Sequence, residues 1–82
     1  MFLGRVKRVK AGKYVVTYLI LDRRDYESLK PKKIAVDVGG VGLVLPVKTG
    51  SLGAYAVIPP EVAELVDSDV LFYRVVGRGG EE

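Results

Sequence analysis

The first half of the chain alternates apolar and polar positions in a way that favours three strands. Residues 2–10 mix apolar with basic side chains, and residues 13–21 are rich in the β-branched and aromatic side chains that are common in strands. Gly12 lies between the two stretches and suits the positive φ of a tight turn. Residues 33–38 continue the pattern, so the sequence predicts a hairpin and then a third strand.

A short helix is predicted between this hairpin and the third strand. Asp22 is a typical N-cap residue, and Asp25 stands three positions later, in the place of a capping box. The predicted helix spans residues 22–29. Pro31 ends it, because the residue before a proline avoids the helical region.

The second half of the chain repeats this layout. Residues 3–40, shifted by 38, fall on residues 41–78 without a gap, and eight of the 38 positions are identical. The expected elements are a strand over 41–48, a turn over 49–53, a strand over 54–58, a helix over 59–66 and a strand over 69–76. A unit of this size buries too little apolar surface to fold alone, so the two copies must pack on each other.

These elements predict one mostly β domain over residues 1–82. We expect a small six-stranded closed barrel made of two ββαβ repeats with two short helices, because closure removes the edges that a short open sheet exposes. Residues 77–82 are a polar, glycine-rich tail, and 79–82 are expected to be disordered.

The composition excludes several kinds of chemistry. The chain contains no cysteine and no histidine, which rules out a disulfide, an ordinary catalytic triad and a His or Cys metal site. We therefore expect a protein that is not an enzyme and that has no cofactor and no metal. No apolar run approaches the ~20 residues of a membrane span, so we expect a cytoplasmic protein without a membrane partner.

Charge divides the two copies. Residues 1–40 contain ten Lys or Arg and four Asp or Glu, a net charge of +6, while residues 41–82 contain three and six, a net charge of −3. The basic copy could attract phosphates.

Cations gather in the first predicted hairpin, at Arg5, Lys7, Arg8, Lys10 and Lys13. In a strand, Arg5 and Lys7 share one face while Arg8 and Lys10 share the other. Because cations on both faces cannot all be buried, at least one face meets solvent or a polyanion. The hairpin either binds phosphates or is a solvated edge whose charges prevent aggregation.

Two further basic groups flank the first helix. Arg23 and Arg24 at its start oppose the helix dipole, which favours a role in contact with an anion. Lys30, Lys32 and Lys33 follow its end, where cations are favoured for structural reasons.

The second copy carries a recognisable motif. A basic residue and a Gly/Ser turn (Lys48-Thr49-Gly50-Ser51) precede a strand ending in Ile-Pro, then a helix with Glu, then a closing strand. The core Ile58-Pro59-x-Glu61-Val62 resembles the AbrB/SpoVT pattern. The resemblance implies a DNA-binding transcriptional regulator that contacts the phosphate backbone through its first hairpin. By position, the implied contacts are Arg5, Lys7, Arg8, Lys10, Lys13 and, in the second copy, Lys48.

A single chain that holds both units is similar to the related cradle-loop barrels, which include the archaeal RIFT barrels. The Gly-Asp pair that often precedes the closing strand in this superfamily is missing, which disfavours a double-psi barrel. A RIFT-type and a swapped-hairpin topology both stay open, as do a monomer and a homodimer.

Two other functions stay open: a small-ligand or nucleotide-binding barrel related to archaeal riboflavin kinase, and a protein-interaction module. The five tyrosines could offer a stacking surface, although tyrosines in short strands more commonly form a barrel wall. The run 41–47 is apolar on both faces and is expected to be buried or to form a subunit contact.

Overall fold

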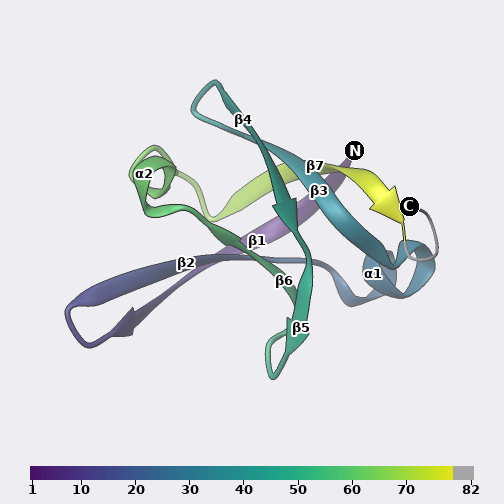
Figure 1. Ribbon diagram of the computed structural model, residues 1–82, viewed down its shortest axis with the longest axis horizontal. Coiled ribbons are helices and arrows are strands. Elements are labelled where there is room, and N and C mark those ends of the chain that lie inside the picture. Colours follow the sequence, from purple (N-terminus) through teal and green to yellow (C-terminus); the bar gives the residue numbers. More distant parts are fainter. Residues whose placement is uncertain (79–82) are drawn as a thin grey trace.

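The computed structural model describes residues 1–78, which form seven strands and two helices (Figure 1). In chain order these are β1 (Phe2–Ala11), β2 (Tyr14–Ile20), α1 (Arg23–Leu29), β3 (Pro31–Val38), β4 (Val41–Pro46), β5 (Lys48–Gly50), β6 (Gly53–Ile58), α2 (Pro60–Ala63) and β7 (Val70–Arg78). The mostly β class and the two short helices are confirmed. No helix within residues 1–78 is long and apolar enough to cross a membrane.

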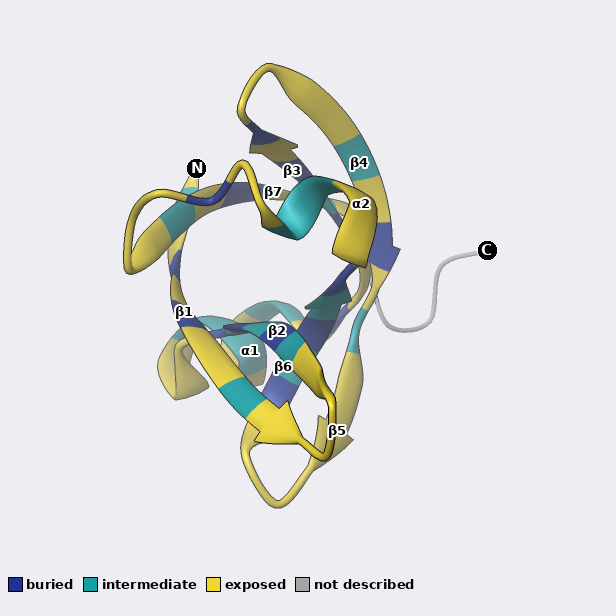
Figure 2. Ribbon diagram, turned by 90° about the vertical axis from the view of Figure 1, so that its left-hand side faces the viewer, coloured by how far each residue is buried: buried dark blue, intermediate teal, exposed yellow. Residues whose placement is uncertain are grey.

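The strands form one antiparallel sheet in the order β4-β3-β7-β1-β2-β6-β5. The sheet curls into a half-barrel that stays open (Figure 2), so the predicted closed barrel of six strands is wrong in both closure and strand number. The strand number differs because the predicted strand is interrupted at Val47, whose N–H donates to the Lys32 carbonyl oxygen at 2.8 Å. This break divides the predicted strand 41–48 into β4, which pairs with β3, and β5, which pairs with β6. Each becomes an edge of the sheet.

The first helix matches its prediction and the second is shorter. The Asp22 carboxylate accepts hydrogen bonds from the backbone N–H groups of Arg24 and Asp25, as an N-cap does. The helix predicted over 59–66 reaches only from Pro60 to Ala63. Pro59 at its N-cap has no side chain that could accept a hydrogen bond, and so short a helix gains little from its own backbone bonds.

Strand β7 runs further than the sequence predicts. Gly77 and Arg78 pair with Lys33 and Pro31 of β3, so both belong to the sheet rather than to the predicted tail. Residues 79–82, the part predicted to be disordered, lie outside the described residues.

The concave face of the half-barrel holds the core (Figure 2). Alternate residues of β2, β6 and β7 point into it, as expected of a sheet with one covered face. Tyr73 is the largest buried side chain, with 2% of its surface exposed, and its ring stacks on Phe2 with centroids 5.6 Å apart.

The apolar run 41–47 is only partly in this core. Leu45 is buried and Leu43 is half-buried, whereas Val44 points to the convex side and is 59% exposed. The expectation of burial holds for one face of β4 and is wrong for the other. Strand β4 is therefore an uncharged edge strand with one apolar face in solvent.

The ladder between β2 and β6 joins the two halves of the chain through pairs such as Tyr18↔Val57 and Leu19↔Ala56. The β3–β7 ladder joins them a second time. The shift of 38 residues places the fully buried Leu19 on the half-buried Val57. The duplication stays a prediction.

Candidate nucleic-acid interface

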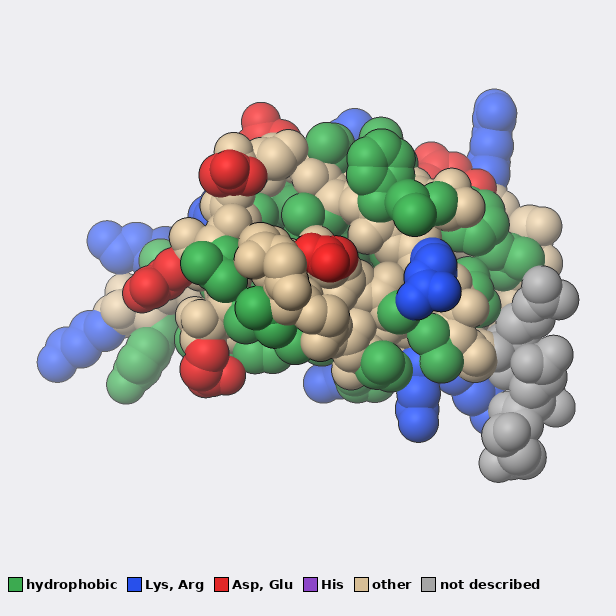
Figure 3. Space-filling model, turned by 90° about the horizontal axis from the view of Figure 1, so that it is seen from above, with side chains coloured by type: hydrophobic (Ala, Val, Ile, Leu, Met, Phe, Trp, Pro, Cys, Tyr) green, Lys and Arg blue, Asp and Glu red, His purple; other side chains and the backbone are tan. Residues whose placement is uncertain are grey.

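The described acidic residues of the second half lie on and after α2. Glu61, Glu64, Asp67 and Asp69 are all exposed. Seen from the side of β4 and α2, acidic side chains gather on the part of the surface over α2, while most Lys and Arg side chains lie at the outline (Figure 3). The described acidic residues of the second half therefore lie together around α2.

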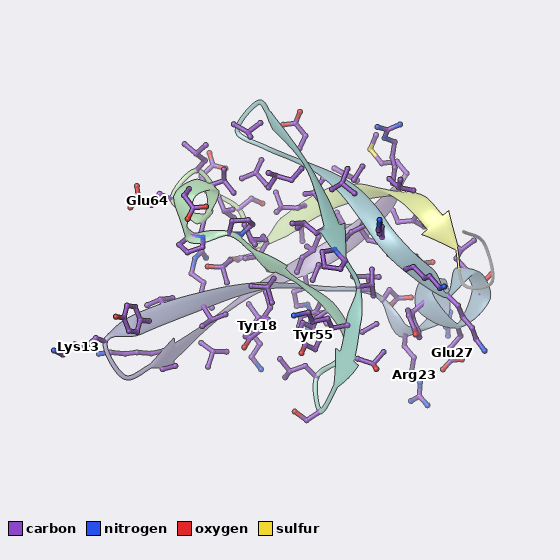
Figure 4. The ribbon with its side chains drawn as sticks, in the orientation of Figure 1. Lys13, Tyr18, Arg23, Glu27, Tyr55 and Glu64 are labelled. Carbon is purple, nitrogen blue, oxygen red and sulfur yellow. The ribbon has the colours of Figure 1, made fainter. Side chains whose placement is uncertain are left out.

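The hairpin of β1 and β2 extends beyond the rest of the sheet. Strand β1 pairs with β7 only over residues 2–5, and β2 pairs with β6 only over residues 17–20. Residues 7–16 thus form a two-stranded ribbon without a third strand beside it, which we call the hairpin arm (Figure 1). No residue of the arm is buried, and residues 10–15 are all exposed. Lys13 lies at its tip (Figure 4).

The arm carries four cations, at Lys7, Arg8, Lys10 and Lys13. The first acidic residue of the chain is Asp22, so no carboxylate neutralises these charges from within the hairpin. The strand alternation separates Lys7 from Arg8 and Lys10 as predicted: Arg8 and Lys10 follow the buried Val6 on the concave face.

Arg8 has a structural task that the sequence did not reveal. Its Nη2 donates to the carbonyl oxygen of Val66 at 2.9 Å, which connects the base of the arm to the loop after α2. A backbone acceptor 58 residues away leaves no sequence signal. Arg8 is therefore anchored on the side of the arm that faces α2, whereas Lys10 and Lys13 lie beyond this contact.

The convex face of β1, β2, β6 and β5 brings other cations together. Cross-strand pairing aligns Arg5, Ile20, Tyr55 and Lys48 in one row. The neighbouring row begins with Lys7, opposite Tyr18. The rings of Tyr18 and Tyr55 meet edge to face, with centroids 5.3 Å apart and planes at 89°.

The Tyr18–Tyr55 pair and the carboxylates around α2 lie on opposite sides of the sheet. In Figure 4, Tyr18, Tyr55 and Arg23 point to one side of the sheet, and Glu64 lies on the other. A polyanion that approaches the convex side therefore avoids the carboxylates around α2 and meets Arg5, Lys7 and Lys48.

A groove of about 470 Å³ borders the same face. Arg5 and Arg23 are its cations, and Asp22 is its one acid. Its apolar walls include Ile20 and Leu52. Arg24 is exposed on α1 but does not line this groove.

The predicted site residues thus fall into separate places. Arg5, Lys7, Arg23 and Lys48 share the convex side, Arg8 and Lys10 lie on the concave face of the arm, Lys13 is at its tip and Arg24 is on α1. The sequence favours a barrel wall for the tyrosines and leaves a stacking surface open. Tyr18 and Tyr55 meet because β2 pairs with β6, which the sequence pattern did not give.

One titratable group has a clearly shifted pKa, and it lies in the core. Burial raises the pKa of Tyr73 to about 12, with smaller contributions from the negative charges of Asp25 and Asp22. Within residues 1–78, no three His, Cys, Asp or Glu side chains gather as metal ligands.

Comparison with known proteins adds no family. No family model, no curated protein and no solved structure matches this chain.

Proposed function

We propose that this protein binds double-stranded DNA by placing the hairpin arm in the major groove. The observation that carries the proposal is the arm itself: a two-stranded ribbon with cations on both faces, no buried residue and no acid. A two-stranded β-ribbon is one of the elements that the major groove admits.

Phosphate contacts supply the affinity in this proposal. Lys7, Lys10 and Lys13 contact the duplex backbone from the arm, and Arg5 and Lys48 add positive charge on the body of the sheet beside it. Each contact releases counterions, so affinity falls steeply with salt. Arg8 supports the arm through Val66.

Recognition of base sequence is weak in this proposal. The chain contains no Asn and no Gln, the side chains that read adenine with two hydrogen bonds. Arginine contacts to guanine and the shape of the duplex are the remaining sources of specificity. The role as a transcriptional regulator rests on the resemblance to the AbrB/SpoVT pattern.

The test is a salt titration of duplex binding by fluorescence anisotropy. Reversing Lys7, Lys10 and Lys13 to Glu should weaken binding on the order of 100-fold and make the slope of log K against log salt shallower by about 2 to 3. The matched control reverses Lys30, Lys32 and Lys33 to Glu, which changes the net charge equally at exposed positions outside the arm. Equal losses in both triple variants, or no binding at low salt, would refute the proposal.

The groove favours a second candidate, a small phosphate-bearing ligand such as a nucleotide. It has room of about 470 Å³, two arginines and apolar walls. A thermal-shift screen with nucleotides and flavins tests this candidate. Stabilisation by a nucleotide that disappears in Arg5→Glu or Arg23→Glu would support it.

A further inference from the structure

We propose that the convex face beside the hairpin arm holds an unpaired base on Tyr18 and Tyr55, so that the preferred ligand is a junction between duplex and single strand. This inference rests on the proposed function, because the arm holds the duplex part. The inference adds a single-stranded segment that lies next to this duplex on the protein surface.

The aromatic pair lies on the solvent side of the sheet. Leu19 and Ala56, the neighbours of Tyr18 and Tyr55 along their strands, point into the core and are fully buried. The two tyrosines therefore point away from the core, and both are only half-buried, with part of their surface in contact with each other. An edge-to-face pair leaves ring surface open to a third planar group.

Cations surround this pair without any acid among them. Lys7 stands opposite Tyr18, and Lys48 stands opposite Tyr55. Residues 1–21 and 48–58, which supply all four strands of this face, contain no Asp or Glu. Aromatic rings for bases beside cations for phosphates are the components of single-strand binding surfaces.

Stacking requires a base that is not already stacked. In a duplex both faces of each base are covered by its neighbours, and only the edges reach the grooves. A ring pair on a sheet can therefore add affinity only for an unpaired base. Lys7 belongs both to the base of the arm and to the row of Tyr18, so a strand leaving the duplex at the arm passes directly onto the tyrosines.

The experiment compares three DNA ligands by fluorescence anisotropy: a blunt duplex, the same duplex with a short single-stranded tail, and the tailed duplex with abasic sites in the tail. We expect the tail to tighten binding by about 5- to 100-fold for one stacked base. The abasic tail keeps the phosphates and should lose this gain. The comparison needs no change in the protein, so it does not depend on how a variant folds.

Variants then assign the gain to the tyrosines. Tyr18→Leu with Tyr55→Leu should abolish the gain from the tail and leave blunt-duplex affinity unchanged, while the double Phe variant should keep the gain. Tyr14→Leu at the exposed end of β2 is the matched control, and it should leave the ratio of tailed to blunt affinity unaltered.

Each outcome decides between the two proposals. Equal affinity for tailed and blunt duplexes, or an equal gain from the abasic tail, overturns the stacking inference. The proposed function survives that result if the arm variants still lose duplex binding. Absence of binding to all three ligands overturns both.

Discussion

The hairpins β1–β2 and β5–β6 occupy corresponding places in the sequences of the two halves, and they differ in length and in charge. In the first, strands of 10 and 7 residues extend past the sheet, and residues 5–13 carry five cations. In the second, β5 has 3 residues and Lys48 is its one cation. Both hairpins belong to the sheet, but only β1–β2 is long and carries several cations. A feature that is present in one half of the chain and absent from the other is the best guide to function here.

The core differs between the halves as well. The shift of 38 residues places Tyr73, the largest buried side chain, on Ala35, which is half-buried and lies opposite the exposed Arg74. A Cβ added at corresponding glycines would meet different neighbouring atoms. Matched Gly→Ala substitutions can therefore compare how tightly the two halves are packed at these positions.

The largest expected effect comes from Tyr73 at high pH. The folded state holds its phenolic proton more tightly than the unfolded state, because burial raises the pKa from about 10 to about 12. The contribution of this proton to the free energy of unfolding is therefore fully present below pH 10. It is lost as the pH rises from about 10 to about 12, which lowers the free energy of unfolding by about 2 to 3 kcal/mol in total. Chemical denaturation between pH 9 and 12 measures this loss. Tyr73→Phe lacks the ionisable group, and an identical pH dependence in that variant would contradict the assignment.

A second comparison uses Gly4 and Gly42, which correspond under the shift of 38 residues. A Cβ on Gly4 would lie 2.7 Å from Cδ1 of Leu19, which is fully buried and cannot yield easily. We expect Gly4→Ala to lower the free energy of unfolding by about 2 kcal/mol. A Cβ on Gly42 meets no atom within 4 Å, so Gly42→Ala should be neutral or slightly stabilising. Urea denaturation of both variants decides the matter, and equal costs would show that the two sites are packed alike.

The third comparison concerns Gly39 and Gly77. Gly39 has a φ of +58°, and its Cβ would lie 2.9 Å from Cβ of Leu65. The unfavourable backbone alone costs an alanine about 1 to 2 kcal/mol, and the Cβ of Leu65 cannot move aside without its backbone, which adds to this cost. Gly77 offers ordinary contact distances of 3.9 Å or more. Thermal unfolding should show Gly39→Ala destabilised and Gly77→Ala close to wild type, and the reverse order would exclude this account.

The smallest expected effect separates Arg8 from Lys10 on the concave face of the arm. Arg8→Leu leaves the Val66 carbonyl without its donor and should cost about 1 kcal/mol of stability. Lys10→Leu should leave stability unchanged and weaken duplex binding. Denaturation and anisotropy on both variants test the distinction. If Lys10→Leu lowers the stability, or if Arg8→Leu leaves it unchanged, the two residues do not differ in the way proposed.

The sequence predicted local elements well and long-range partners poorly. Asp22 and the β-branched runs defined α1, β1 and β2 because capping and strand preference are local properties. The break between β4 and β5 at Val47 was not predicted, since the hydrogen bond of Val47 to Lys32 of β3 is a long-range contact.

The candidate site shows the same limit. The basic hairpin was visible as a cluster of charges in the sequence. The roles of its members were not visible, because Arg8 bonds to a carbonyl 58 residues away. Tyr18 meets Tyr55 only through the pairing of β2 with β6.

The strand order also has a kinetic consequence. Four of the six ladders, namely β1–β7, β2–β6, β3–β4 and β3–β7, join a strand of the first half to a strand of the second. Before the second half has been synthesised, the first half can form only the β1–β2 ladder, and contacts between distant residues slow folding. A nascent chain therefore exposes its basic hairpin before it has a core, and two separate fragments divided at Gly39 and Gly40 should find each other to form the native fold.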